Sequence, residues 1–362
     1  MKKWRMRVKL EVHCVMALIA AGAACLAVTP VNTLLAHQIM EKAPPEPLPS
    51  APVLTATPSP ALLVLNKAES ALAIVDPRTL KVVAKVPTGP IPHEVAVSSD
   101  GKLAVETNYG AHQDGTSLSV IDLVTQTELH RVELGLLRGP HGVAFIDGKA
   151  WFTAEGSKEI ARYNPGTNQV DWVLEIGQNR THMLVPSRDG RTIYTANVNS
   201  DSVSVCALEK EPPGARWSQT IIPVGKGPEG MDLSPDGKQL WVANSHDGTV
   251  SIVDTAAKKV MQTIDVKTKF SNRLKFTLDG KLVLITDLGS GDLLVMDAAT
   301  QKEVKRLHLG KSVEGVFIAP DGVRAFVAET GENKVAVFDL KTLAVAATFS
   351  TGEEPDGMAW AP

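Results

Sequence analysis

Short runs of alternating hydrophobic and polar residues recur along most of the chain, and each run is bounded by turn residues. In one unit, residues 230–235 and 239–244 are β-rich runs on either side of an Asp-Gly pair, which favours a tight hairpin turn. Two further alternating runs follow at 249–253 and 260–266, with no helical spacing between them. The pattern therefore predicts a four-stranded antiparallel sheet.

The Asp-Gly pairs recur at a nearly constant period. The spacings between them are 47, 42, 47, 43 and 42 residues, and the pairs begin at Asp100, Asp147, Asp189, Asp236, Asp279 and Asp321. A period near 43 residues is the length of one propeller blade, and residues 61–362 accommodate seven such units. The sequence therefore predicts an all-β, seven-bladed β-propeller built from four-stranded antiparallel blades.

The repeat begins and ends out of phase. The chain enters it at residues 62–66 with a run that corresponds to a second strand, and it finishes at 356–360 with a run that corresponds to a first strand. We expect the C-terminal strand to pair with the N-terminal blade. This pairing would close the ring and leave no long strand edge unpaired.

The first sixty residues differ from the repeats. Basic residues at 2–9 precede an apolar run at 14–28, which is typical of a signal peptide, and small residues at 21–23 provide a cleavage site. An uncleaved membrane anchor is the alternative, and lipidation of Cys25 is another. Seven prolines in residues 43–60 favour an extended spacer. The expected organisation is a signal peptide or N-terminal membrane anchor (1–40), a Pro-rich linker (41–60) and the propeller (61–362). With such an N-terminus, we expect the protein to be exported, and to be either periplasmic or anchored in the membrane and facing the periplasm or the outside.

Composition excludes several classes of function. The chain has 37 Lys and Arg against 40 Asp and Glu, a net charge of −3, so it lacks the basic surface of a strong nucleic-acid binder. Cys206 is the single cysteine of the repeat region, which excludes a disulfide framework or a cysteine zinc site there. The sequence has no C-x-x-C-H motif for haem c and no phosphate loop for a nucleotide. We expect the partner to be a small ligand or a protein at the channel face.

Several units share motifs beyond the Asp-Gly pair. Tyr-Thr-Ala-Asn at 194–197 and Trp-Val-Ala-Asn at 241–244 occupy matching places, and Gly-Lys-Gly-Pro-Glu-Gly at 225–230 precedes Ser-Pro-Asp-Gly at 234–237. These motifs resemble the YVTN-type (YncE-like) seven-bladed β-propeller repeat over about five-sixths of the chain. The resemblance implies the fold. It does not imply one function, because such propellers include exported proteins of unassigned role, surface-layer components and lactonase-like relatives.

Two units depart from this repeat. The third has Phe-Thr-Ala-Glu at 152–155 where the repeat ends in Asn. The fourth has Cys206 in place of a turn Asp and carries an insertion at 209–216.

Aligning the units places two sets of polar residues at one face of the ring. The first set begins the first strands and would line the channel mouth: His93, His141, His182, Glu229, Asn272, Glu314 and Asp356. The second set ends the second strands: Asn66, Asn108, Glu155, Asn197, Asn244, Asp287 and Glu329. We expect the asparagines to tie the blades together. The two sets together, with their imidazoles and carboxylates, favour the binding of a cation at this face.

Five residues of the first set come from consecutive blades, in the order Asp356, His93, His141, His182 and Glu229. Imidazole and carboxylate ligands suit Zn, Cu, Ni, Mn or non-haem Fe. These five residues are therefore candidate ligands for one divalent metal ion at the channel mouth, in a non-catalytic binding or scaffold role. A purely structural role, in which the histidines hydrogen-bond across the channel, stays open.

The resemblance to lactonase-like propellers implies an alternative. His182, Glu229 and Arg273 would then bind and hydrolyse a cyclic ester at the same face. The sequence has no Gly-x-Ser-x-Gly motif and no zincin helix. Whether the protein is an enzyme is left open at this point.

Overall fold

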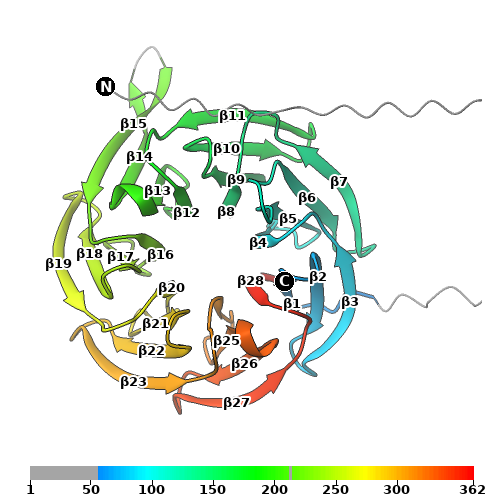
Figure 1. Cartoon of the computed structure of the whole chain (residues 1–362). Coiled ribbons are helices and arrows are strands. Elements are labelled where there is room, and N and C mark those ends of the chain that lie inside the picture. Colours follow the sequence, from blue (N-terminus) through cyan, green and yellow to red (C-terminus); the bar gives the residue numbers. More distant parts are fainter. Residues whose placement is uncertain (1–55, 212–213) are drawn as a thin grey trace, which may run out of the picture. The chain divides into compact units, whose positions relative to one another are not determined.

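The computed structural model describes residues 56–211 and 214–362, which form seven four-stranded antiparallel sheets around a central axis (Figure 1). The predicted all-β, seven-bladed propeller is confirmed. The predicted signal peptide or anchor (1–40) and most of the linker (41–60) lie outside the described residues. Within the described part of the chain, no helix has the length and apolar character needed to cross a membrane.

Each blade has its first strand at the channel and its fourth strand at the rim, and we name the blades A to G. Blade A consists of β28 (Pro355–Ala361), β1 (Ala61–Asn66), β2 (Ala71–Asp76) and β3 (Lys81–Pro87). Blade B consists of β4 (Pro92–Val97), β5 (Leu103–Asn108), β6 (Ser117–Asp122) and β7 (Thr127–Glu133). Blade C consists of β8 (Pro140–Ile146), β9 (Lys149–Ala154), β10 (Glu159–Asn164) and β11 (Gln169–Glu175). Blade D consists of β12 (Thr181–Pro186), β13 (Thr192–Asn197), β14 (Ser202–Glu211) and β15 (Gly214–Pro223), with a 3-10 turn at Val198–Ser200.

The remaining three blades follow the same plan. Blade E consists of β16 (Pro228–Leu233), β17 (Gln239–Asn244), β18 (Thr249–Asp254) and β19 (Lys259–Asp265). Blade F consists of β20 (Ser271–Phe276), β21 (Leu282–Asp287), β22 (Asp292–Asp297) and β23 (Lys302–His308). Blade G consists of β24 (Val316–Ile318), β25 (Arg324–Glu329), β26 (Lys334–Asp339) and β27 (Ala344–Phe349), with a 3-10 turn at Thr330–Glu332.

The ring is closed as the phase of the repeat predicts. The C-terminal strand β28 pairs antiparallel with β1, with Trp360 opposite Leu62 and Met358 opposite Val64. Figure 1 shows the red end of the chain beside the blue strands of blade A. This pairing gives blade A its innermost strand.

The hydrophobic core lies between neighbouring blades. The second and third strands are buried on both faces because each blade packs against two others, whereas outer strands such as β11 alternate between exposed and half-buried residues. Leu63 and Leu72 of blade A, for example, share a cluster with Ile121 of blade B, and all three are fully buried. Packing of this kind fixes the angle between blades and so the positions of the residues at the channel.

Candidate functional site

The first strands bring the first predicted set of polar residues to one end of the channel. His93, His141, His182, Glu229, Asn272 and Asp356 are each the second residue of their strand, and Glu314 lies two residues before β24. His93 is half-buried, with 18% of its side chain exposed, and the other six are buried. Below this mouth the channel contains a cavity of about 480 Å³, lined by residues from all seven first strands.

The backbone of the mouth is fixed by contacts between blades. Thr107 of blade B donates to the carbonyl oxygen of His141 at 2.6 Å, and Thr153 of blade C donates to that of His182 at 2.5 Å. Gly142 follows His141, where a Cβ atom would lie 2.8 Å from the Leu184 nitrogen. A larger residue there would force β8 away from β12. The Pro-His-Gly sequence thus allows two histidine-bearing strands to approach closely.

The five candidate metal ligands form an arc in the order that the sequence suggested. The ring centroids of His93 and His141 are 4.8 Å apart, and those of His141 and His182 are 3.7 Å apart. Asp356 lies at one end, 3.4 Å from His93 Nδ1, and Glu229 lies at the other, 2.9 Å from His182 Nε2. The His141 ring therefore contacts the rings of both His93 and His182, with a carboxylate at each end of the arc.

Glu155 completes a tighter group within this arc. One ligand atom each of His141, Glu155 and His182 lie within 4.8 Å of one another, and all three residues are buried. Glu155 hydrogen-bonds to His182 Nδ1 and accepts from the Tyr109 hydroxyl at 2.8 Å. Arg180 Nε lies 3.4 Å from its second oxygen. Tyr109 and Arg180 thus hold the Glu155 carboxylate against the histidines.

The histidines differ in protonation. Burial disfavours the charged form of His182, but Glu229 and Glu155 outweigh it and raise its pKa to about 9. Burial lowers the pKa of His93 to about 3, although Asp356 opposes this. Burial, with His182 and His93 nearby, holds the pKa of His141 well below its usual value. At neutral pH His141 is therefore a neutral imidazole beside a protonated His182.

The sequence alignment placed Glu155 in the wrong set. Proline at the start of the first strand pairs with Asn108 in blade B but with Ala154 in blade C, so Ala154 ends the second strand there. The reason is a tighter hairpin, in which Ile146 pairs with Lys149 across Asp147-Gly148. The second strand of blade C therefore ends one residue sooner after the Asp-Gly turn than the repeat predicts. Glu155 instead occupies the position of Tyr109 in blade B, the residue after the strand. The two-residue turn was the signal that would have revealed it.

Two asparagines of the second set serve the architecture, but they make these contacts within one blade and not between blades as expected. Asn108 donates to Ser117 and Ser119 at 3.1 Å, and Asn244 donates to Thr249 and Ser251 at 2.9 Å. These contacts tie the second strand to the third within one blade.

The opposite half of the mouth contains its own cations. Lys67, which follows β1, makes an ion pair with Glu314 and lies 3.6 Å from Asp356. Burial, reinforced by Asp356, raises the pKa of Glu314 to about 7, although Lys67 opposes the shift. A lysine ammonium group thus already pairs with carboxylates of this half.

Arg273 reaches across the channel to blade B. Its Nη2 and Nε lie 2.6 and 2.8 Å from Glu94 Oε1, and its Nη1 donates to Asn272 at 3.1 Å. Blades B and F are not neighbours, so this buried ion pair ties two distant parts of the ring together. The three residues of the lactonase-like set are therefore divided: His182 contacts Glu229, whereas Arg273 is engaged by Glu94.

Known proteins similar to this chain share its architecture. The family model "Lactonase, 7-bladed beta-propeller" matches residues 169–270, which include His182 and Glu229 but not Arg273. Two curated relatives, the uncharacterized YncE proteins of Salmonella typhimurium and Salmonella typhi, are each 27% identical over 180 residues. The match covers 49% of this chain and 50% of theirs, so the chain spans about half the length of these curated relatives. The chain is a YncE-like seven-bladed propeller.

Solved structures resemble this YncE-like propeller in fold. A putative 6-phosphogluconolactonase from Bacteroides uniformis has a TM-score of 0.71 at 17% identity, covering 83% of this chain and 99% of its own. The periplasmic gluconolactonase of Pseudomonas aeruginosa has a TM-score of 0.67 at 16% identity, covering 84% and 99%. Hydrazine synthase from Kuenenia stuttgartiensis has a TM-score of 0.66 at 19% identity, covering 77% and 92%. Such low identities show the shared fold alone.

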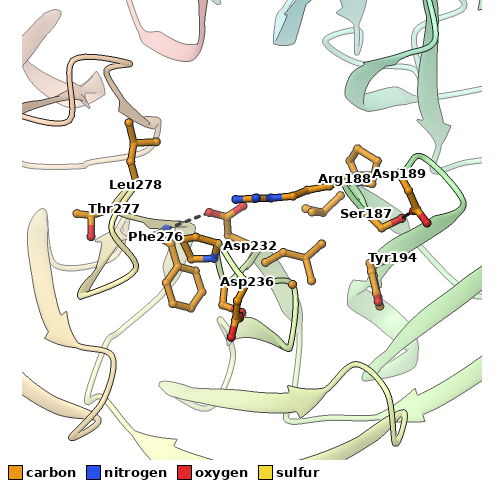
Figure 2. Close-up of a pocket in the computed structure, with 15 residues that line it drawn as sticks. Ser187, Arg188, Asp189, Tyr194, Asp232, Asp236, Phe276, Thr277 and Leu278 are labelled. Carbon is orange, nitrogen blue, oxygen red and sulfur yellow. Dashed lines mark hydrogen bonds between the residues drawn. The ribbon is translucent and has the colours of Figure 1, made fainter.

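The YncE-like propeller also has a pocket at the other end of its strands. It has a volume of about 550 Å³, and Figure 2 shows Arg188 and Asp232 directed into it beside Phe276. Its walls come from the Asp-Gly turns of blades D, E and F, whereas the histidines lie where the first strands begin. The convergent titratable groups, rather than this pocket, mark the candidate site.

Proposed function

We propose that the channel mouth binds one divalent transition-metal ion through His141, Glu155 and His182, in a binding rather than a catalytic role. The observation that carries this proposal is the Nδ1 atom of His141. It is buried and has no hydrogen-bond partner among the described residues, and its residue, His141, belongs to the group formed with Glu155 and His182. A buried polar atom without a partner is costly, and a metal ion would satisfy it.

The donor set has suitable chemistry. Two imidazoles and a carboxylate suit zinc and its neighbours in the first transition row. His141 is neutral, and His182, Arg180 and a Tyr109 hydrogen bond lower the pKa of Glu155 although burial opposes them. A metal ion would replace the proton of His182, as metals generally do at titratable ligands. Ligand atoms on a tetrahedral zinc lie about 3.4 Å apart, so this group, whose atoms lie within 4.8 Å of one another, would have to contract around the ion through side-chain rotation.

Two of the five ligands predicted from the sequence, His141 and His182, belong to the proposed metal site. Glu229 supports His182 from the outside, and His93 and Asp356 belong to the half of the mouth that contains Lys67. We therefore assign these three residues to the surroundings of the site. Export, which the first forty residues favour, would expose such a site to metal ions outside the cytoplasm.

The hydrolase alternative receives less support. His182, with a pKa of about 9, carries its proton at neutral pH and so is a poor general base. Arg273 is held by Glu94 on the far side of the channel. Hydrolysis of a lactone by His182, Glu229 and Arg273 would require both the His182–Glu229 and the Arg273–Glu94 contact to break.

Melting curves test the proposal through linkage between binding and folding. Zinc at about a hundred times its dissociation constant should stabilise the folded ring by about 2.7 kcal/mol, a rise of about 5 °C, and a chelator should reverse it. His141→Gln should remove this response, whereas the matched variant His93→Gln should keep it. A zinc response that is identical in His141→Gln would rule out the assigned ligands.

A further inference from the structure

The insertion at 209–216 lengthens the last hairpin of blade D. β14 and β15 have ten residues each, whereas the corresponding strands of blade E have six and seven. The first pair beyond the six that blade E forms is Leu208 opposite Trp217, and these two residues flank the insertion. The Trp217 ring lies against blade C, with its centroid 5.4 Å from that of Trp172 and 5.7 Å from that of Trp151. The added pair thus brings three tryptophans together at the boundary of two blades.

These tryptophans line a cavity of about 350 Å³ on the outer part of the ring, far along the strands from the channel mouth. Trp151 is 5% exposed and forms the floor, while Trp172 and Trp217 are half-buried. The rim carries Lys149, Arg162 and Asp147. A cavity of this size, with aromatic walls and a few polar groups, has the usual make-up of a small-molecule site.

Charges at this rim are balanced. Asp171 lies 2.6 Å from both Lys149 Nζ and Arg162 Nε, and the Arg162 guanidinium lies 5.2 Å from the centre of the Trp151 ring. An ammonium and a guanidinium have more donors than these contacts use, and the exposed Asp147 carboxylate offers acceptors. The rim can therefore both donate and accept hydrogen bonds, without a net charge that would select an ion.

We propose that this tryptophan pocket binds a neutral pyranose sugar. A pyranose has a face of C–H groups, which gains dispersion energy against an indole ring, and a rim of hydroxyls, which need donors and acceptors. Hydrogen bonds to charged side chains such as Lys149 are the stronger kind. An entirely aromatic ligand would bury the charged rim without satisfying it, at a cost in free energy. The pocket is independent of the metal site.

Intrinsic fluorescence tests the proposal, because three of the six tryptophans line the pocket. The probes are the methyl glycosides of glucose, galactose and mannose, added to the metal-stripped protein. At least one should give a saturable change below about 100 mM, a dissociation constant in the millimolar range or lower. Trp360→Phe, which alters a tryptophan of blade A, should leave the titration unchanged.

Two variants separate a binding role from a packing role. Trp217→Ala should lose the saturable change while it retains a cooperative melting curve. Lys149→Met keeps all three tryptophans and should weaken binding at least about fivefold through the lost hydrogen bond. No saturable change with any of the three glycosides, or equal binding by the wild type and Lys149→Met, would overturn the proposal. Phenol binding in place of the glycosides would do the same, by assigning the pocket to an aromatic ligand.

Discussion

Removal of the last seven residues, 356–362, will abolish cooperative folding of the propeller. These residues form nearly all of β28, and without them β1 becomes an open edge although Leu62 and Val64 are fully buried in the intact ring. The deletion also removes Asp356, which neutralises Lys67. The loss should exceed about 5 kcal/mol, a large part of the stability of a typical domain. We expect insoluble protein or a broad thermal transition by circular dichroism.

Deletion of Pro362 alone is the matched control, since that residue lies beyond β28 and is exposed. It should leave the melting curve unchanged. A seven-residue truncation that melts like the full chain would show that the ring does not depend on closure by the C-terminal strand.

Glu106→Val will stabilise the protein, and the gain will grow with pH. Glu106 is fully buried in β5, and neither carboxyl oxygen has a hydrogen-bond partner among the described residues. Its place opposite the first strand, beside Val95, corresponds to Val242, Ile285 and Val327 in other blades. Valine has nearly the volume of glutamate and leaves no polar group unsatisfied. We expect a gain of about 1–3 kcal/mol at pH 4.

The pH dependence follows from the raised pKa of this carboxyl. Burial, assisted by Glu128 and opposed by Arg131, holds the pKa of Glu106 well above its usual value. Above about pH 4.5 the unfolded chain loses the Glu106 proton while the folded protein keeps it, so wild-type stability falls as pH rises toward the folded pKa. The advantage of valine should therefore be larger at pH 8 than at pH 4. Urea unfolding at both pH values measures it.

Glu133→Gln, a change at an exposed position on the outer strand β7, is the control and should shift stability by less than about 0.5 kcal/mol. If Glu106→Val destabilises the protein, or stabilises it equally at the two pH values, then Glu106 has a role that its burial does not reveal.

The fold could be predicted because its determinants are local. Asp-Gly turns and alternation specify each hairpin, and the phase of the first and last runs specifies closure. The first polar set could be predicted for the same reason, since each member lies at or just before the start of a first strand. Glu155 was assigned to the wrong position because the short turn at Asp147-Gly148 shifts the second strand of blade C by one residue. An alignment that assumes the same number of residues after every Asp-Gly turn does not detect this shift.

Contacts across the channel could not be predicted from the repeat. Glu94 and Arg273 are 179 residues apart, and Lys67 and Glu314 are 247 residues apart. Whether such side chains meet depends on the width of the closed ring and on side-chain reach, which no local pattern encodes. The pairing of Lys67 with Glu314 and Asp356 is what restricts the candidate metal site to the histidine half of the mouth.

Calorimetric titration of zinc into chelator-treated protein measures the proposed metal site directly. We expect one zinc ion per chain with a dissociation constant of about 1 µM or lower. His141→Gln should weaken binding at least about tenfold, because it removes a buried nitrogen that has no hydrogen-bond partner in the described part of the chain, and His93→Gln should bind as the wild type does. Heat that does not saturate, or His141→Gln that binds zinc as tightly as the wild type, would contradict a metal site formed by His141, Glu155 and His182.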